Sequence, residues 1–270
     1  MYHTRSDNSF GICQLGKWGN FDHNHIDSLS KEVIDLSEPF PVWLSTLKEI
    51  HNLFIVSTFS DPCEISNALD LVRICRNYII FITVITPKEN QYRTDLSELK
   101  NSADVFLCLE DEYYEEEKVT DPVSYAIDFM AHSFDEYIDE SDFKPWYEGQ
   151  FYAFSHSGCA QLVVFDLMKE DYEMRDAFQL PNEIVQKITG KRLGFLYIKS
   201  GSDSRIWPGD FITNTFKKAS GNMIYAGWHG ISGLRFGKKS WITAIVSDMD
   251  NPNNSFGNGK NKTVFQGGRR

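Results

Sequence analysis

The chain has 270 residues, a net charge of −11, 41% hydrophobic residues and 14% aromatic residues. This composition is typical of a globular protein with one large domain or two ordinary ones. The negative charge excludes a general affinity for DNA or RNA, whose phosphates require a basic protein surface. We find no apolar run of about eighteen residues, no signal-peptide pattern and no Cys-x-x-Cys spacing among the five cysteines. We therefore expect a reduced, cytoplasmic protein that does not insert into a membrane.

In the first half, apolar runs of strand length alternate with helical patterns. The expected strands are 10–15, 53–57, 78–85 and 105–109, and the expected helices are about 41–51, 63–77 and 95–102. Strands that are apolar throughout and separated by helices predict a parallel sheet that is covered on both faces. The predicted fold class is therefore α/β.

The turn between the strand at 53–57 and the next helix has an unusual composition. Residues 58–64 read Thr-Phe-Ser-Asp-Pro-Cys-Glu and contain no glycine. This pattern predicts a capping box, with Asp61 as the N-cap, Pro62 at the first helical position and Glu64 at the third. A helix capped in this way has its free N–H groups satisfied internally, and its two carboxylates repel phosphate.

The middle of the chain combines an acidic run with a long helix. Six carboxylates lie between Glu110 and Glu117, and we interpret this run as a solvated acidic loop. Asp121 and Pro122 then begin a helix whose apolar residues, from Val123 to Ile138, form a single stripe.

The second half has a mixed α+β pattern. Strands are expected at 150–155, 161–166, 193–199, 222–227 and 240–247, and helices at about 169–177, 181–189 and 209–219. From Met249 the chain is rich in Asn and Gly, which indicates a flexible tail. We predict a sheet domain at 1–120, a central helix and following loop at 121–144, a second domain at 145–248 and a tail at 249–270.

Several segments, taken in order, resemble the tubulin/FtsZ superfamily. "QLGKWGN" resembles the first nucleotide loop of that family, "LKNSADVFLCLED" the strand before its base-contacting loop, and "DESDFKPWYEGQFYAFSHSG" its synergy loop and the strand that follows. The resemblance implies a parallel sheet domain, a long central helix and a smaller mixed second domain. It also implies a connection with cell division.

The resemblance assigns possible roles to individual residues. Gly16, Gly19 and Asn20 match the first nucleotide loop, and Asp139 and Asp142 match the synergy-loop acids that act on nucleotide across a subunit interface. The composition of 139–142 is equally typical of a turn or a helix cap, which is the commoner use of such residues. The chain also departs from the family. The family's glycine-rich phosphate loop corresponds to 58–64, where no glycine remains, and its base-contacting asparagines correspond to Asp111 and Ser124.

These departures favour a divergent FtsZ-like protein that has lost GTP binding. Such a protein requires no cofactor, is not an enzyme, and acts through interaction with FtsZ or with itself as an oligomer. The alternative is a divergent GTPase that uses GTP and Mg²⁺ through Gly16, Gly19 and Asn20, and is active only on assembly. Paired glycines are, however, more commonly used for a tight turn.

Two other groups of residues have compositions found in functional sites. Asp22, His23, His25 and Asp27 have the composition of a metal site, but no strand or distant ligand supports one, and we interpret them as a polar loop without metal. His156, Ser157 and Cys159 leave open a third possibility, an unrelated α/β enzyme with a nucleophile at this point.

Overall fold

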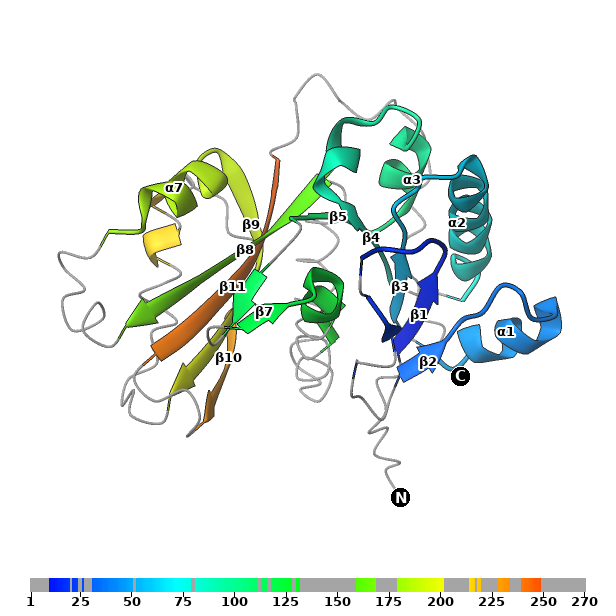
Figure 1. Ribbon diagram of the computed structural model, residues 1–270, viewed down its shortest axis with the longest axis horizontal. Coiled ribbons are helices and arrows are strands. Elements are labelled where there is room, and N and C mark those ends of the chain that lie inside the picture. Colours follow the sequence, from blue (N-terminus) through cyan, green and yellow to red (C-terminus); the bar gives the residue numbers. More distant parts are fainter. Residues whose placement is uncertain are drawn as a thin grey trace, which may run out of the picture.

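The computed structural model describes residues 10–19, 21–23, 26, 31–50, 52–78, 81–110, 113–115, 118–127, 130–131, 159–168, 179–201, 214–216, 218–219, 228–233 and 239–248. Within these residues, the main element is a nine-stranded sheet in the order β10-β9-β11-β8-β5-β4-β3-β1-β2 (Figure 1). Its strands are β1 (Phe10–Gln14), β2 (Lys31–Val33), β3 (Asn52–Val56), β4 (Phe81–Pro87), β5 (Val105–Leu109), β8 (Cys159–Met168), β9 (Lys191–Gly201), β10 (Trp228–Gly233) and β11 (Lys239–Asp248).

Six neighbouring strands of this sheet, β8, β5, β4, β3, β1 and β2, run parallel, which confirms the predicted α/β sheet. β11 is antiparallel to both β8 and β9, so the second half is mixed as predicted. β8 pairs with β5 at its start and with β11 along most of its length. A single sheet therefore passes from the first half of the chain to the second. The domain boundaries proposed from the sequence stay predictions.

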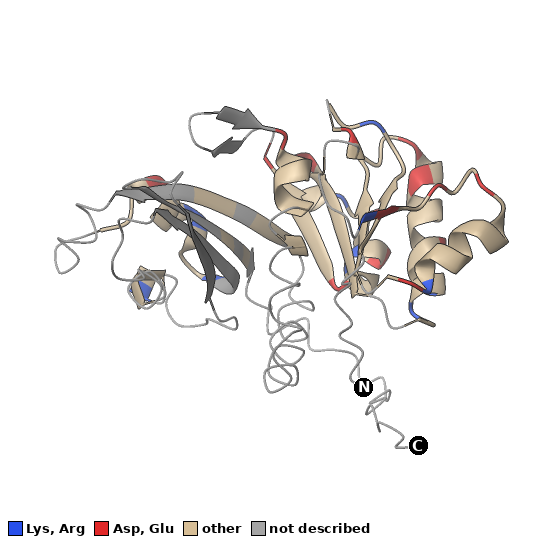
Figure 2. Ribbon diagram, turned by 90° about the horizontal axis from the view of Figure 1, so that it is seen from below, with Lys and Arg blue, Asp and Glu red and all other residues tan. Residues whose placement is uncertain are grey.

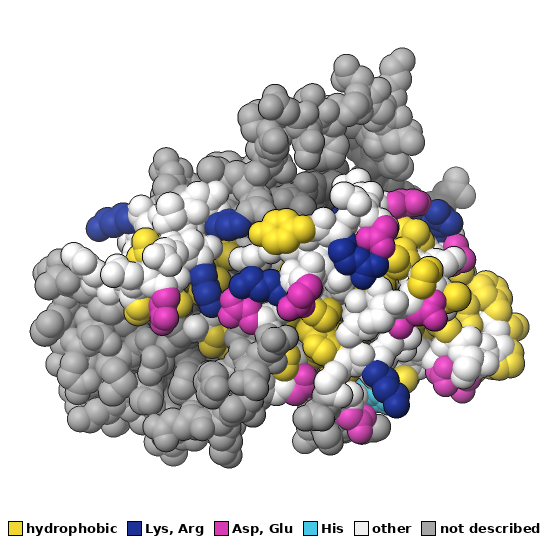
Figure 3. Space-filling model, turned by 45° about the horizontal axis from the view of Figure 1, so that its top comes forward, with side chains coloured by type: hydrophobic (Ala, Val, Ile, Leu, Met, Phe, Trp, Pro, Cys, Tyr) yellow, Lys and Arg dark blue, Asp and Glu magenta, His cyan; other side chains and the backbone are white. Residues whose placement is uncertain are grey.

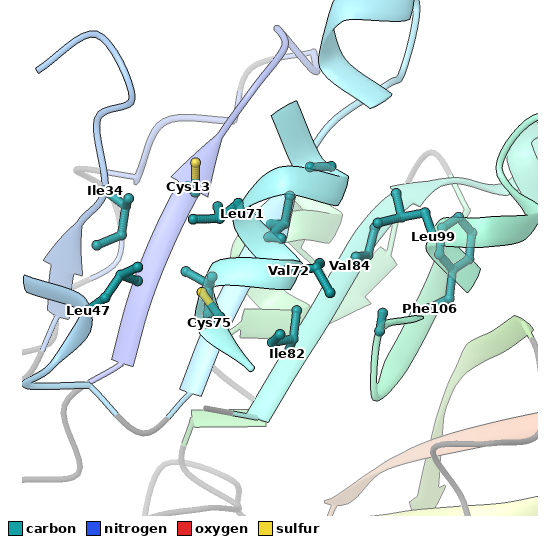
Figure 4. Close-up of a cluster of buried hydrophobic side chains, with 14 of the residues drawn as sticks. Cys13, Ile34, Leu47, Leu71, Val72, Cys75, Ile82, Val84, Leu99 and Phe106 are labelled. Atoms are coloured by element: carbon teal, nitrogen blue, oxygen red, sulfur yellow. The ribbon is translucent and has the colours of Figure 1, made fainter. Parts of the chain in front are cut away.

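One face of the parallel part is covered by helices. They are α1 (Phe40–Leu47), α2 (Pro62–Cys75) and α3 (Ser97–Ser102), with the 3-10 helix η2 (Lys88–Tyr92) after β4. Ala68, Leu71, Val72 and Cys75 recur at helical spacing along α2 and are all buried. Figure 4 shows Leu71, Val72 and Cys75 over the strands that carry Cys13, Ile82 and Val84.

The opposite face is covered by the helix that follows Asp121, of which residues 122–127 and 130–131 are described. Its buried residues pack against strands β1, β3 and β5; they are Val123, Tyr125, Ala126, Ile127 and Met130. Asp121 accepts hydrogen bonds from the N–H groups of Val123 and Ser124, as expected of an N-cap. The sheet is therefore covered on both faces, as predicted.

Some elements differ from those expected. Residues 31–33 form the edge strand β2, which the sequence did not indicate. The acidic run is not a simple loop, because β6 (Tyr113–Glu115) and β7 (Lys118–Thr120) pair as a small antiparallel sheet. The predicted strands 150–155 and 222–227, the helix 169–177 and the tail from Met249 lie outside the described residues.

α7 (Asn182–Ile188) covers part of the second half, close to the predicted 181–189. Gly190 follows it with a φ of +72°, the left-handed conformation expected of a helix-terminating glycine. In Figure 2, the half that carries α1 and α2 lies beside the half formed by the strands from β8 onward. Within the described residues, no helix combines the length and the apolar character that crossing a lipid bilayer requires.

Candidate functional site

The candidate site lies at the carboxyl ends of β1 and β3, the edge where parallel α/β sheets bind ligands. These strands are neighbours, and the Leu15 N–H continues their pairing by donating to the Val56 carbonyl at 2.9 Å. The loop after β1, with Gly16 and Gly19, therefore lies beside the loop after β3, residues 57–61. In the resemblance to FtsZ, these two loops correspond to nucleotide loops.

The Glu64 carboxylate occupies the space between the two loops. Ser57 Oγ donates a hydrogen bond of 2.6 Å to Glu64 Oε2. A Cβ placed on Gly16 would lie 2.6 Å from Glu64 Oε1 and 2.9 Å from its Cδ. Contacts that short do not occur for real side chains, so glycine at residue 16 is what allows the carboxylate to approach the first loop.

The N-terminus of α2 is capped by the protein itself. Asp61 has extended backbone angles and its Oδ1 accepts the Cys63 N–H at 2.8 Å, with Pro62 at the start of the helix. The predicted N-cap is thus confirmed. The second half of the capping box differs, because the Glu64 side chain turns toward Ser57 and Gly16. Glu64 therefore links the start of α2 to the two loops and does not complete the predicted capping box.

The loop after β3 is held in one conformation by side chains from η2 and the residue that follows it. Phe59 is buried with a φ of +53°, which is rare for a bulky residue. Its N–H donates to Ser57 Oγ at 2.9 Å, and its carbonyl accepts from Arg93 Nη1 at 2.7 Å. Asn90 Nδ2 donates to the Thr58 carbonyl at 2.8 Å. The loop thus directs two carbonyl oxygens at protein donors.

Arg93 is fixed in turn by its neighbours. Nη1 also donates to Asn90 Oδ1, at 3.2 Å, and the guanidinium forms an ion pair with Asp95. The hydrogen bond to Asp95 raises the pKa of Arg93 above its ordinary value, and the Glu64 charge acts in the same direction. The group therefore stays cationic while it holds the loop.

Beside the Glu64 carboxylate, the carboxyl ends of β1 and β2 border an open hollow of about 460 Å³. Its lining mixes polar and apolar side chains: Gln14, Leu15, Gly16, Lys17, His23, Val33, Ile34 and Asp35. Gln14 Nε2 donates to the Gly16 carbonyl at 3.1 Å, which ties the first loop to its own strand.

The structure describes only part of the predicted site. Gly19 has a φ of +52° and open space around it, so it serves the tight turn that follows β1. Gly16 serves the approach of Glu64 instead. Asn20 and the synergy-like acids Asp139 and Asp142 lie outside the described residues, and their roles stay predictions.

Most of the remaining candidate residues either serve the helix cap or lie outside the described part of the chain. Ser124, the counterpart of a base-contacting asparagine, donates its hydroxyl to Asp121 at 2.6 Å and so serves the helix cap. Asp111, His25, Asp27, His156 and Ser157 are not described, while Cys159 begins β8. No group of three metal-binding side chains lies among the residues that are described.

The sequence did not indicate the partners of Glu64 or the residues that hold the loop. Ser57 was recognisable only as the end of an apolar strand, and Asn90 and Arg93 occur in a polar stretch without a motif. Phe59 gave no signal, because a left-handed conformation is not expected of phenylalanine.

Comparisons with known proteins give matches in structure alone. No protein-family model and no curated protein matches the sequence. A point mutant of FtsZ from M. jannaschii matches with a TM-score of 0.53 at 11% identity, over 90% of this chain and 92% of that one. CetZ from Methanosaeta thermophila matches with a TM-score of 0.45 at 13% identity, over 78% of this chain and 66% of that one. Together with the sheet order described above, the FtsZ match shows that this chain has a tubulin/FtsZ-like fold.

Proposed function

We propose that this protein is an FtsZ-like protein that has lost GTP binding and acts by contact with other proteins, either FtsZ or further copies of itself. The observation that supports the proposal most is the Glu64 carboxylate, held by Ser57 against Gly16 at the place where the fold family binds phosphate.

Charge opposes a nucleotide at this position. A phosphate charge about 5 Å from a carboxylate costs roughly 3 kcal/mol at an effective dielectric near 20. Asp61 and Glu64 both lie at the N-terminus of α2, so each adds a cost of this kind. Figure 2 shows further acidic positions spread over the helices and connections of this half of the molecule.

Two N–H groups in and after the loop that follows β3 also support the proposal, because they already donate within the protein. Glycine-rich phosphate loops turn successive N–H groups toward the anion. Here the N–H groups of Phe59 and Cys63 donate to Ser57 and Asp61. A phosphate at this position would therefore have to displace hydrogen bonds that the protein already makes.

The proposed partners rest on the fold rather than on this site. In our proposal, a chain with an FtsZ-like architecture and a filled phosphate position acts through the outer surfaces by which such subunits contact one another. Asp139 and Asp142, placed by the resemblance on the synergy loop, are our candidates for such a contact.

The test combines light scattering with phosphate release, using the purified chain with GTP and Mg²⁺, alone and mixed with FtsZ. We expect no phosphate release by the chain alone and scattering that GTP leaves unchanged. We also expect binding to FtsZ, or to itself, to be weakened by the double variant Asp139→Asn, Asp142→Asn. Asp70→Asn on the exposed surface of α2 is the matched control. GTP-dependent assembly of the chain alone with phosphate release would instead establish the divergent GTPase.

A further inference from the structure

The strand β2 forms one edge of the sheet and exposes backbone hydrogen-bonding groups. The Ile34 N–H donates to the Ile12 carbonyl at 2.9 Å, on the side of β2 that faces β1. Since successive residues of a strand point their N–H and C=O groups to opposite sides, those of Val33 point away from the sheet. No strand among the described residues pairs with that side.

β2 is protected mainly by its length of three residues, and less by its lysine. Proteins commonly place lysine on exposed edges to prevent pairing with another chain. Lys31 is the only basic residue between 31 and 47, and its Nζ donates to the carbonyls of His23 and Ile26 at 2.7 and 2.8 Å. Its charge is therefore directed toward the chain's own loop.

Exposed apolar side chains occur on β2 and on α1, which packs on the face of the sheet that carries Ile34, opposite to Val33. Val33 is 44% exposed, Phe40 at the start of α1 is 51% exposed, and Val42 is 47% exposed. The Phe40 ring packs edge-on against Trp43, with 4.8 Å between ring centroids, so it is held in place at the surface. Figure 3 shows hydrophobic side chains gathered at the end of the molecule where α1 lies, with acidic side chains beside them.

The hollow described above continues this surface, since Val33 and Asp35 both line it. Three exposed carboxylates border it, those of Glu32, Asp35 and Glu38, while Lys17 also lines the hollow. An open strand edge, apolar side chains and an acidic border thus occur together at β2 and α1, which we call the β2 surface.

We propose that the β2 surface binds an extended segment of a partner protein in which basic and apolar side chains alternate. The segment adds a strand to β2, its main chain pairs with Val33, its basic side chains lie on the face that carries Glu32, and its apolar side chains lie on the face that carries Val33. This inference rests on the proposed function as an interaction protein. A strand-like segment fits better than a second copy, because three partly exposed apolar side chains fall far short of the ~800 Å² per partner that a standard interface buries.

The test uses fluorescein-labelled peptides of about eight residues, one alternating lysine and valine and one alternating glutamate and valine, measured by fluorescence polarisation. We expect the lysine peptide to bind and the glutamate peptide not to bind. Val33→Pro removes the outward N–H and leaves the β1 pairing intact, and is expected to weaken binding by about tenfold or more. Val33→Lys, which keeps the N–H, serves as a second variant if the proline variant fails to fold.

Matched controls separate this site from general attraction to an acidic protein. Glu32→Lys should weaken binding several-fold, whereas Glu89→Lys on η2 should leave it unchanged. Tyr92→Ala, at a side chain that is 83% exposed, should also have no effect. Equal binding by all variants, or no binding by wild type at about 1 mM, would overturn the proposal. A dimer in sedimentation equilibrium that Val33→Pro dissociates would also overturn it, by assigning the edge to a second copy.

The peptide-binding experiment can succeed or fail independently of the experiment on GTP binding. If the chain binds neither GTP nor peptide, only the proposed role of the β2 surface is overturned. If it binds both, only the proposed loss of nucleotide binding is overturned.

Discussion

Gly16 and Glu64 are complementary in shape: the carboxylate of Glu64 occupies the space that a side chain at residue 16 would need. A Cβ at residue 16 would lie 2.6 Å from Glu64 Oε1. Gly16→Ala should therefore displace the carboxylate from Ser57, and because the carboxylate ends a flexible side chain, the cost should be limited to the lost hydrogen bond, about 0.5–1.5 kcal/mol of the free energy of unfolding. Urea denaturation measures the change.

A double-mutant cycle distinguishes this contact from a general effect of alanine. In a Glu64→Ala background, Gly16→Ala should cost much less, because the clashing carboxylate is gone. Gly19→Ala is the control: its φ of +52° and open surroundings predict a cost of about 1–2 kcal/mol in both backgrounds. Equal costs for Gly16→Ala with and without Glu64 would contradict the contact.

Arg93 is expected to stabilise the loop after β3. Arg93→Ala leaves the carbonyl of the buried Phe59 without its 2.7 Å donor and should cost about 1–3 kcal/mol in urea denaturation. Arg73→Ala is the control, since Arg73 forms only exposed ion pairs and should change stability little. A cost for Arg93→Ala no larger than for Arg73→Ala would show that the loop does not depend on this donor.

Glu110 should make part of the stability dependent on pH. Burial opposes its ionisation, but hydrogen bonds from Lys88 and Lys187, both at 3.0 Å, outweigh burial and lower the pKa of its carboxyl. A lowered pKa in the folded state stabilises the fold above the pKa of the unfolded chain, about 4.3, and this stabilisation is lost as the pH falls through the folded value.

Glu110→Gln should therefore destabilise the protein at neutral pH and less at about pH 3, because the wild-type carboxyl gains its proton as the pH falls through its lowered pKa. Denaturation at the two pH values measures the difference. Lys187→Met, which removes one of the two donors, should reduce the effect of Glu110→Gln at neutral pH. An effect of Glu110→Gln that is the same at both pH values would rule out this role.

The cysteines should differ in reactivity. Burial raises the pKa of the Cys13 and Cys75 thiols to about 12, so both are protected by burial and by protonation. Cys63 is exposed, although hydrogen bonding to Asp61 raises the pKa of its thiol. With iodoacetamide and peptide mapping at pH 8, alkylation of Cys63 should precede that of Cys13 and Cys75. Early alkylation of Cys13 or Cys75 would contradict the packing between β1 and α2.

The sheet and its covering helix were predictable because short apolar runs and helical spacing can be read from neighbouring residues. The run at 105–109 became β5 with the same bounds, and Ala68, Leu71, Val72 and Cys75 recur at the spacing of a buried helix face. The edge strand β2 was missed because Glu32 and Val33 are exposed, so no buried face produces a pattern. The hairpin β6–β7 was missed because its acidic residues resemble a solvated loop.

The candidate site was only partly predictable, for a different reason. Asp61 is identifiable as an N-cap from adjacent residues, and the structure confirms it. The contact between Glu64 and Gly16 joins the first turn of α2 to the loop after β1, two segments far apart in sequence that the pairing of β1 with β3 brings together. The sequence indicated an acid near the phosphate position but not the glycine that accommodates it.

Equilibrium titration of the purified wild-type chain with fluorescent GTP and Mg²⁺ tests the central claim most directly. With Glu64 held against Gly16, we predict no saturable binding at nucleotide concentrations up to about 1 mM. Saturable binding at micromolar GTP that competes with unlabelled GTP would show that the carboxylate leaves room for phosphate, and would contradict this account.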